Sequence, residues 1–531
     1  MPTLFELDVL SSVLACFVLY AIFSFIRTQT LAACRHPPYP PGPKKLPILG
    51  NLLDLPLQHP WVAFHEMSLK YDSDVIHLKA PGLNIIYLDS VQAINDLLEK
   101  RSAIYSSRPV MTMMEYMGWT EKFPFMEYND TWKAQRRIFQ REFGKEDARR
   151  FEKQERRAAY ELLGRCLDAP EDILGHIRHL AGSTILAITY GIEVLPTGDP
   201  SIVAAERCLD AITFATMPGL FWLVDAFPFF MKLPEWLPGF PFRKQAKIWR
   251  HDMEQMVDEP FQRVKRDMAE GGAGSSSIVS RYLDSISIHE MTAEERSKAE
   301  KLIRDLGGSV YVGGADTTVS SFASFFRHMV RNPQIQRKAQ AELDRVLGIG
   351  QLPEFKDEAS LPYITAILRE TLRDSTVTPF ACPHRSTNDD VYRGWYVPKG
   401  SVILPSVWAL AHDPKVYPDP FQFVPERFLT PSGALNPQVT DPMTFTFGFG
   451  RRICPARFMG WSSMWITIAS VLAVFDILPC LDEKGEEIIP TLEYKNGIVV
   501  HPVPFKCRIV PRSKEHEILV RNLVDNNVGS Y

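Results

Sequence analysis

The chain lacks the features that mark several common classes of protein. Its 531 residues include only eight cysteines, and none of them forms a Cys-x-x-Cys pair, so neither a zinc site nor a disulfide framework is indicated. The formal net charge of −4 leaves no basic excess of the kind that nucleic-acid-binding domains carry. No internal repeat is present. With 45% hydrophobic and 23% charged residues, the composition is that of a globular protein with no nucleic-acid partner.

A long hydrophobic run, by contrast, stands near the N-terminus. Residues 9–26 carry no charge, and as a helix these 18 residues would measure about 27 Å, close to the roughly 30 Å hydrocarbon thickness of a bilayer. Acidic Glu6 and Asp8 precede the run and basic residues from Arg27 onward follow it, which disfavours a cleaved signal peptide and orients the C-terminal part toward the cytosol. We therefore expect a lumenal tail at residues 1–8 and a single-pass transmembrane anchor at 9–26.

Prolines separate this anchor from the rest of the chain. Five of them lie between residues 36 and 43, so the anchor helix cannot continue, and residues 27–45 are predicted to form a proline-rich hinge. No convincing domain boundary follows, so residues 46–531 are expected to form one large domain. A 3.6-residue apolar period predicts helices at 129–166, 246–270, 290–331 and 333–347. Alternating apolar residues predict strands at 73–88, 391–405 and 486–510. The predicted fold class is mainly α with small β-sheets.

The segment FTFGFGRRICPARF, residues 445–458, places a lone cysteine behind two glycines and two arginines. Cys454 is compatible with two kinds of chemistry. A nucleophilic cysteine would need a histidine base, and the glycines would then serve an oxyanion hole. A metal-bound thiolate would instead use the backbone N–H groups of the turn to keep its charge in a dry site. The two arginines suit the edge of an anionic ligand.

The same segment resembles a known motif. Phe447, Gly448, Gly450, Arg452 and Cys454 match, in order and spacing, the haem-binding loop of the cytochrome P-450 monooxygenases. The resemblance implies a cytochrome P-450 fold, with haem b (iron protoporphyrin IX) held between a long central helix and this loop. It also implies that Cys454 is the metal ligand, a thiolate on the haem iron, and that Phe447 and Gly450 belong to the haem-binding residues.

Further residues follow the family's pattern, and one departs from it. Glu370 and Arg373 in YITAILRETLRDS match the family's Glu-x-x-Arg element, and Arg427 in FVPERF matches the third member of its buried Glu-Arg-Arg triad, which has a structural role. The family usually has glycine two residues after the cysteine, where this chain has Ala456. Because that position begins a helix, alanine is expected to be tolerated.

Haem carries two propionates, which need cationic or donor partners. Trp132 and Arg136 in NDTWKAQRRIF match the family's Trp-x-x-x-Arg element, which binds a propionate in that family. Arg452 and His384, the latter in CPHRSTNDD, match two further propionate partners. The alternative for His384 is an ordinary polar residue in a turn.

An unusual helix sequence completes the predicted site. In VGGADTTVSS, residues 312–321, two glycines and two threonines interrupt a long helical pattern in which they are poor helix formers. One reading is a simple helix break. The resemblance instead implies an oxygen-binding groove, in which Thr317 diverts its hydroxyl to a carbonyl one turn back and opens a bulge. Asp316 would then be the acidic member of a proton relay, so Asp316 and Thr317 are the predicted catalytic residues.

The family's activity is the expected function. The domain at 46–531 would be the catalytic domain of a monooxygenase, which inserts one oxygen atom of O2 into a lipophilic small molecule. NADPH would supply the electrons through NADPH-cytochrome P-450 reductase, with cytochrome b5 as a further donor, at the cytosolic face of the endoplasmic reticulum membrane. A basic face would attract this acidic partner, and its expected members are Lys133, Arg137 and Arg451.

The substrate is less well defined. The segments VWALAHDPKVYPDPFQFVPERF and NGIVVHPVPFKCRIVPR resemble fungal microsomal members of secondary metabolism. Segments 108–126 and 211–240, which line the distal pocket in the family, are rich in Met, Phe and Trp, although such stripes are more often ordinary core. A terpenoid, a sterol or a polyketide-like aromatic is the expected substrate.

Two other classes remain open. A non-catalytic haem-binding protein would need Cys454 and the propionate partners but not the Asp316-Thr317 pair. A haem-thiolate isomerase or peroxide-using enzyme of the same fold would dispense with outside electrons, and its relatives typically lack such a pair.

Overall fold

A computed structural model describes residues 36–216, 222–233, 242–271, 276–288 and 290–528. The expected lumenal tail, the anchor at 9–26 and the first part of the hinge lie outside these residues. Within the described part, one helix, Arg457–Val474 (α17), is long and apolar enough to cross a membrane, but 72% of it is buried inside the protein. It is a core helix, and the membrane anchor stays a prediction.

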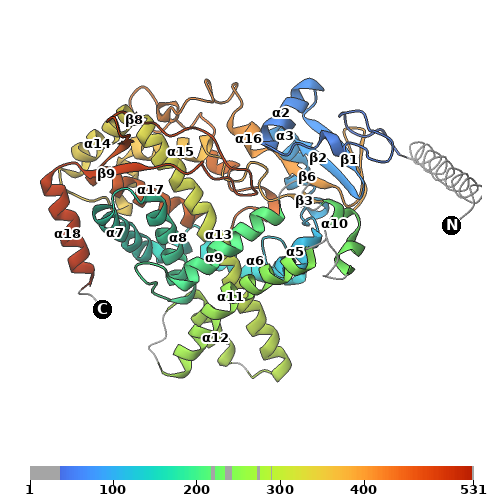
Figure 1. The fold of residues 1–531 in the computed structure, drawn as a ribbon, viewed down its shortest axis with the longest axis horizontal. Coiled ribbons are helices and arrows are strands. Elements are labelled where there is room, and N and C mark those ends of the chain that lie inside the picture. Colours follow the sequence, from blue (N-terminus) through green and yellow to red (C-terminus); the bar gives the residue numbers. More distant parts are fainter. Residues whose placement is uncertain (1–35, 217–221, 234–241, 272–275, 289, 529–531) are drawn as a thin grey trace, which may run out of the picture.

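Helices dominate the molecule, as the sequence predicts (Figure 1). They are α2 (Pro60–Lys70), α3 (Val91–Ile94), α4 (Ser102–Tyr105), α5 (Thr112–Tyr116), α6 (Asp130–Phe143), α7 (Glu152–Asp168), α8 (Ile173–Tyr190), α9 (Pro200–Ala215), α10 (Trp222–Ala226), α11 (Phe242–Ala269), α12 (Ile278–Ser287), α13 (Ala293–Arg331), α14 (Pro333–Leu347), α15 (Pro362–Asp374), α16 (Val407–Ala411), α17, and α18 (Lys514–Val528).

The strands form three small sheets. They are β1 (Val75–Ala80), β2 (Leu83–Leu88), β3 (His384–Arg385), β4 (Asp390–Tyr392), β5 (Trp395–Val397), β6 (Val402–Pro405), β7 (Phe475–Leu481), β8 (Glu487–Ile488) and β9 (Cys507–Pro511). The largest sheet has the order β1-β2-β6-β3, in which only the β2–β6 pair is parallel. It lies beside α2 and α3, away from the main helical body (Figure 1).

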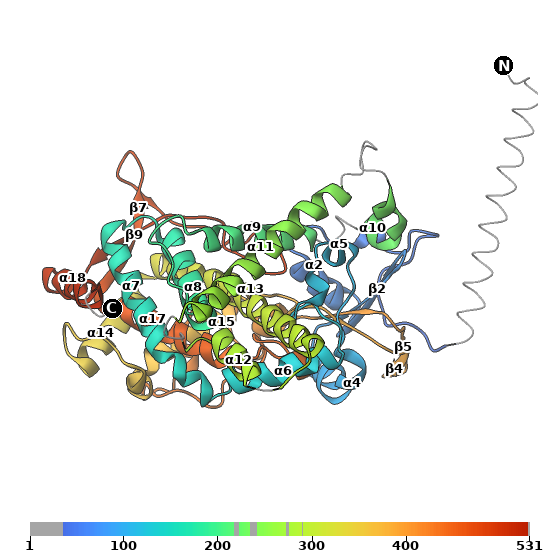
Figure 2. The ribbon, with the colours of Figure 1, turned by 90° about the horizontal axis from the view of Figure 1, so that it is seen from below.

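The long helix α13 runs through the middle of that helical body, next to α8 (Figure 2). It starts at a capping box, in which the Thr292 side chain accepts from the Glu295 N–H and the Glu295 carboxylate accepts from the Thr292 N–H. It ends at Asn332, and Pro333 starts α14, as predicted. Its first half packs in a hydrophobic cluster with α8, α9 and α11, and its second half packs with α7, α15 and α17. One helix therefore joins the two main parts of the core.

Two sequence-based expectations are wrong in detail. The helix predicted at 129–166 is two helices, α6 and α7, because Gly144 ends the first and a 3-10 turn at Asp147–Phe151 changes the direction of the chain. The strand signal at 486–510 yields only the short β8 and the start of β9. Prolines in the intervening segment remove backbone donors, and the chain there forms a loop closed by a bridge between Tyr494 and Pro502.

Candidate active site

The loop that carries Cys454 is a tight turn closed by backbone contacts. The Cys454 N–H donates to the Phe447 carbonyl at 2.8 Å. Gly448 and Gly450 have positive φ angles of 81° and 58°, a conformation that favours glycine. A Cβ at position 450 would lie 2.1 Å from the Leu98 carbonyl oxygen. Gly450 is therefore required for the close approach of this loop to the preceding chain.

The environment of the Cys454 thiol suits a ligand better than a nucleophile. Burial raises the pKa of Cys454, while the Ala456 backbone N–H and the charges of Arg136 and Arg457 act in the opposite direction. Among the described residues, no histidine is hydrogen-bonded to its sulfur, so the base that a nucleophile needs is missing from this part of the chain. A bound metal cation would hold the sulfur as a thiolate.

Three arginines gather near this loop without an acidic partner. The Arg136 guanidinium donates to the Ile453 carbonyl at 2.6 Å, and Arg452 and Arg108 each donate to three backbone carbonyls. Burial, and then the nearby charge of Arg108, lower the pKa of Arg452 to about 8. None of the three arginines pairs with a carboxylate of the described residues. Buried charge of one sign favours an anionic ligand at this place.

Trp132 adds a donor to the same place. Its ring lies under the Arg452 guanidinium at 4.3 Å from the ring centroid. Its Nε1–H is buried and has no acceptor among the described residues. An indole N–H can only donate, and leaving it unpaired costs about 1 to 3 kcal/mol. An oxygen atom of a bound anion would satisfy it, so the structure brings Trp132, Arg136 and Arg452 together as the sequence predicts.

His384 belongs to this group with one condition. Its Nδ1–H donates to the Tyr105 carbonyl at 2.7 Å, and burial, followed by the charge of Arg108, lowers its pKa well below the usual range. In that neutral ring Nε2 is an acceptor. His384 can therefore donate to a bound carboxylate only after a second proton is added, which the negative charge of that carboxylate would favour. Its role in binding stays a prediction.

The middle of α13 has an opening at the predicted place. Residues 313–318 are partly exposed, whereas Val312 and Val319 on either side are buried. The Thr317 hydroxyl donates to the Gly313 carbonyl at 2.8 Å, as expected. The α-helix nevertheless runs without interruption from Ala293 to Arg331, so the expected bulge is not present. The Ser321 hydroxyl likewise donates to the Thr317 carbonyl, at 2.9 Å.

The two glycines of this segment have different functions. A Cβ on Gly313 would meet nothing within 4 Å, so this residue borders open space. A Cβ on Gly314 would lie 2.9 Å from the Ile185 side chain, so this glycine allows α8 to pack closely. Ala315, the next residue, packs against the same hydrophobic cluster as Ala456 of the cysteine loop. The opening in α13 and the Cys454 loop thus border one region of the core.

Asp316 points to a different neighbour than Thr317. Its Oδ1 lies 2.8 Å from His501 Nε2. Both side chains line a cavity of about 360 Å³ between α8, α9, α13 and the segment 495–504. The catalytic roles of Asp316 and Thr317 stay predictions, but the helix presents them on neighbouring faces.

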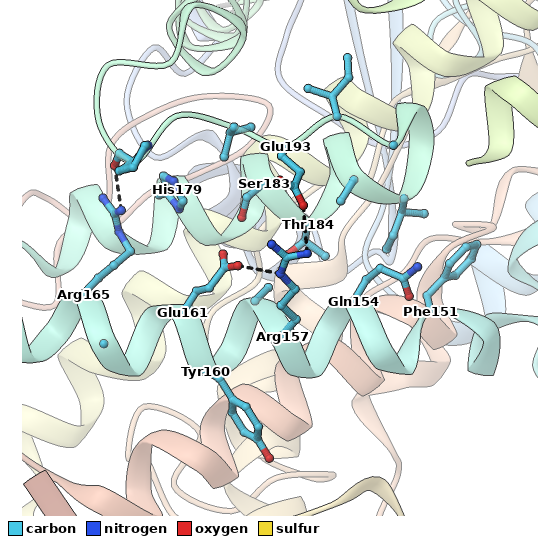
Figure 3. A pocket seen from close by; sticks show the side chains of 18 of the residues that line it. Phe151, Gln154, Arg157, Tyr160, Glu161, Arg165, His179, Ser183, Thr184 and Glu193 are labelled. Atoms are coloured by element: carbon cyan, nitrogen blue, oxygen red, sulfur yellow. Dashed lines mark hydrogen bonds and ion pairs between the residues drawn. The ribbon is translucent and has the colours of Figure 1, made fainter. Parts of the chain in front are cut away.

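Another cavity, of about 600 Å³, lies between α7 and α8 and contains none of these residues. Figure 3 shows its charged side chains, among which Arg157 lies between Glu161 and Glu193. Its Arg165 Nε and Gln154 Oε1 are buried without a hydrogen-bond partner among the described residues, but the cavity holds neither Cys454 nor any other predicted site residue. It is not the candidate active site.

Two members of the site were missed in the sequence. Arg108 lies in the segment YSSRPV, where its only signal is a cation without an acidic neighbour in the sequence. Arg457 donates to the Cys454 carbonyl at 3.1 Å and lies three residues after the cysteine, a spacing that places it in the first turn of α17. Arg457 could have been found from that spacing, whereas the burial of Arg108 depends on the tertiary fold.

Comparison with known proteins gives the same assignment. The model of the family "Cytochrome P450", here written cytochrome P-450, matches residues 40–509. The chain belongs to the cytochrome P-450 family. It is 43% identical over 489 residues to cytochrome P-450 monooxygenase 98 of Postia placenta, covering 92% of this chain and 93% of that one.

Other relatives of this cytochrome P-450 are also fungal monooxygenases. The chain is 42% identical over 483 residues to cytochrome P-450 monooxygenase ple1 of Rhodocybe pseudopiperita, covering 91% of each chain. It is 38% identical over 501 residues to tryptamine 4-monooxygenase of Psilocybe cyanescens, covering 94% of this chain and 97% of that one. The protein is a cytochrome P-450 monooxygenase.

The cytochrome P-450 motifs that do not touch the site are also in place. Arg373 donates to both oxygens of Glu370 at 2.8 and 2.9 Å, and Arg427 Nε donates to the same carboxylate at 3.1 Å. Glu370 and Arg373 are fully buried, so the predicted triad is formed. Ala456, which replaces the family's usual glycine, has φ −91° and ψ 18° and is the N-cap of α17. Any L-residue can adopt this backbone conformation, so alanine fits.

The residues fit the haem-thiolate cofactor that a cytochrome P-450 implies. Haem b would bring two carboxylates to the buried Arg108 and Arg452 and the half-buried Arg136, and to the Trp132 N–H, all of which lack an acidic partner or acceptor among the described residues. Cys454 would supply the sulfur ligand from its backbone-closed turn.

Proposed function

We propose that this cytochrome P-450 inserts one oxygen atom of O2 into a lipophilic small molecule, by hydroxylation or a related oxidation. The observation that carries the proposal is that the Cys454 turn lies beside three arginines and the Trp132 N–H, which have no carboxylate or acceptor among the described residues. Together they provide the sulfur ligand and the anion partners for haem b. Arg108, Arg136 and Arg452 would hold the propionates, with His384 as a fourth partner once protonated.

When bound, the haem-thiolate group would supply the reductive activation of dioxygen. The chain's own residues would bind and orient the reactants and would move protons. The Thr317 hydroxyl is held by the Gly313 carbonyl at 2.8 Å, beside the open space that Gly313 leaves, and is placed to hold a water there. Asp316, on the neighbouring face that lines the 360 Å³ cavity, is placed to take up a proton there and pass it on. A positioned acid or base of this kind typically contributes about 10² to 10⁴ in rate.

We infer that NADPH supplies the electrons through NADPH-cytochrome P-450 reductase, with cytochrome b5 as a further donor. The support is a depression of about 480 Å³ beside the Cys454 loop, and five cations line it: Lys133, Arg136, Arg137, Arg451 and Arg457. Lys133 is paired with Asp130 at 2.9 Å, but Asp130 is almost fully exposed, so that pair is weak. Such a basic surface attracts an acidic partner protein.

The expected substrate is a terpenoid, a sterol or a polyketide-like aromatic. One relative is named tryptamine 4-monooxygenase, which supports an aromatic ring as one possible target. Within the methionine-rich segment, Met113, Met114, Met117 and Trp119 are completely buried in a hydrophobic cluster. The partly buried Ile498 and the opening at 313–318 are better candidates for contact with substrate.

We also propose that the enzyme is held at the endoplasmic reticulum membrane by the uncharged run at 9–26, with the catalytic domain in the cytosol. The bilayer would then both hold the enzyme and deliver the lipophilic substrate to it.

One comparison tests the proposed function. A panel of terpenoid, sterol and aromatic substrates is incubated with the full-length enzyme, NADPH and the reductase, and in parallel with hydrogen peroxide alone. Product that depends on NADPH and reductase supports the monooxygenase reaction. Product from peroxide alone, with no effect of the reductase, would instead support the isomerase or peroxide-using alternative. Haem binding without product in either arm would support a haem-binding protein.

A further inference from the structure

The cavity of about 360 Å³ beside α13 is lined by seven ionisable side chains. Its walls are α8, α9, α13 and the segment 495–504, and the three helices lie side by side in both views (Figure 1; Figure 2). The ionisable side chains that face it are Arg178 from α8, Glu206 and Asp210 from α9, Tyr311 and Asp316 from α13, and Lys495 and His501 from the segment 495–504. Such a cavity can hold water, because it is large and its polar partners are many.

His501 is placed opposite Asp316 by the backbone around it. The Ser320 hydroxyl, one turn after Asp316 on α13, donates to the Val500 carbonyl. The Val500 N–H donates to the Val377 carbonyl at 2.9 Å. The His501 carbonyl accepts from the Lys495 N–H at 2.8 Å, which closes the loop. The short distance between His501 and Asp316 therefore follows from a fixed loop and a fixed helix.

The other charged side chains that line the cavity are Arg178, Glu206, Asp210 and Lys495. Arg178 Nε and Glu206 Oε1 lie 3.5 Å apart, and their side chains are 50% and 46% exposed, so this ion pair lies at the solvent side. Asp210 of α9 and Lys495 of the loop, which have opposite charges, also line the cavity. The side chains of His501 and Asp316 are 29% and 15% exposed. Exposure thus falls from the mouth through His501 to Asp316.

Asp316 connects this cavity to the opening in α13. Ala315, Val319 and Ala323 line the cavity with Asp316, whereas Thr317 does not. Thr317 instead bonds to Gly313, whose Cβ position faces open space. A carboxylate at position 316 lies on the helix between these two faces, so a proton that reaches it from the cavity has arrived next to the predicted oxygen-binding residue.

We propose that His501 is the proton-relay and positioning residue for Asp316. Protonated His501 gives its Nε2 proton to the Asp316 carboxylate, which leaves neutral imidazole and a carboxylic acid. Asp316 passes that proton toward the Thr317 side and is a carboxylate again, and His501 takes a new proton from cavity water. The balance is one solvent proton delivered per cycle, with both side chains restored. Imidazole suits this exchange because it gains and loses protons near neutral pH.

The proposal rests on the proposed function, so its first test is one that does not need turnover. The full-length enzyme in lipid nanodiscs, as the diamagnetic ferrous carbonyl complex, is labelled with ¹³C at its 13 histidines. The His501 ring signal is assigned as the one missing in His501→Gln and is titrated with pH in the wild type and in Asp316→Asn. We expect the His501 midpoint to change in Asp316→Asn, because the carboxylate that lies 2.8 Å from its Nε2 is gone. An unchanged midpoint would show that the two groups do not interact and would overturn the proposal.

The second test separates a relay from a purely structural contact. Glutamine at 501 keeps a neutral donor but cannot carry a proton, so a residue that only holds Asp316 in place would be replaced by it. We expect His501→Gln to lower product per NADPH consumed by on the order of tenfold, below the 10² to 10⁴ of a positioned acid or base because cavity water can still reach Asp316. We also expect the pH profile of this ratio to differ between the wild type and His501→Gln, because the glutamine side chain cannot carry a proton.

The matched control is His179→Gln, the same substitution in the charged cavity between α7 and α8 (Figure 3). We expect it to leave both the ratio and its pH dependence unchanged. If His501→Gln keeps the wild-type ratio and pH profile while the wild type makes product normally, the relay is overturned alone. A wild type that makes no product with NADPH and reductase overturns the proposed function and the relay together.

Discussion

Arg452 is buried among backbone carbonyls and two other guanidinium groups, Arg108 and Arg136. Its charge is therefore held in place by hydrogen bonds but not neutralised, and its pKa of about 8 reflects that cost. A carboxylate of a bound cofactor would reverse the cost. The same argument applies to the Trp132 N–H, which is buried with no acceptor among the described residues. At the scale of single residues, the site is defined by a buried charge and a buried donor that no described residue satisfies.

The first prediction concerns Arg452. Arg452→Met should release haem to an acceptor protein roughly 10- to 100-fold faster than the wild type, because a charged hydrogen bond contributes about 1.5 to 3 kcal/mol. The neighbouring Arg451→Met is the control, since Arg451 is exposed and bonds to the Tyr128 hydroxyl. The measurement is the rate of haem transfer. Equal rates in the two variants would remove Arg452 from the propionate site.

The second prediction concerns Thr317. Thr317→Ala should keep folding, haem and substrate binding, because a small residue suits α13, yet lose product while NADPH use continues and hydrogen peroxide appears. The general acid-base contribution at stake is about 10² to 10⁴ in rate. The measurement is product formed per NADPH consumed, with peroxide quantified alongside.

Thr317→Ser is the control for this prediction, since it keeps the hydroxyl that donates to the Gly313 carbonyl. It should restore most of the coupling. A ratio that stays at the wild-type value in Thr317→Ala would exclude the residue from the mechanism and favour the non-monooxygenase alternatives.

At the scale of elements, α13 explains how one helix can be both rigid and open. Its ends are fixed by the Thr292 capping box and by Asn332-Pro333, and its two halves are buried in different parts of the core. Only the stretch at 313–318 is partly exposed between them. The poor helix formers there are tolerated because packing on both sides, rather than local propensity, stabilises the helix.

The third prediction uses the two adjacent glycines of α13. Gly314→Ala should lower the free energy of unfolding by about 1 to 3 kcal/mol, because its Cβ would press against Ile185 of α8. Gly313→Ala should be neutral or stabilising by up to about 1 kcal/mol, because its Cβ meets no atom and alanine is the better helix former. The measurement is denaturant unfolding of both variants. A larger loss in Gly313→Ala than in Gly314→Ala would contradict the packing.

At the scale of the whole molecule, the net charge of −4 conceals a local basic surface beside the Cys454 loop. Coulomb attraction between this surface and an acidic reductase is long-ranged and is screened by salt. The electron-transfer partner and the proposed membrane anchor would together fix the orientation of the enzyme.

The fourth prediction follows from that surface. Reductase-supported turnover at limiting reductase should fall as salt rises from about 0.01 to 0.3 M, where the screening length shortens from about 30 Å to less than 10 Å. Arg137→Glu should weaken reductase-supported turnover and reduce its dependence on salt. Arg178→Glu, at the solvent side of the cavity beside α13, should change neither. The KM for reductase at several salt concentrations is the quantity to measure. A salt-independent KM in the wild type would exclude this docking surface.

Much of this architecture can be predicted from the sequence, for identifiable reasons. The Cys454 loop, the Trp132–Arg136 spacing and the Asn332-Pro333 boundary depend on neighbours in the chain, and all are found where they were expected. The burial of Arg108 and the contact between Asp316 and His501 depend on segments far apart in the sequence, which no local pattern reveals. The methionine-rich segment left pocket lining and ordinary core open, and in the structure its Met113, Met114 and Met117 are buried in a hydrophobic cluster.

The central claim is that Cys454 is the thiolate ligand of a haem iron, and the most direct measurement is the absorption spectrum of the reduced carbonyl complex. The wild type should show the red-shifted band of thiolate-ligated iron, and Cys454→Ser should lose it. Cys382→Ser is the control, because Cys382 is the other described cysteine that is only partly buried, and it should keep the band. A Cys454→Ser variant that retains the band, or a haem-loaded wild type that never shows it, would contradict the account.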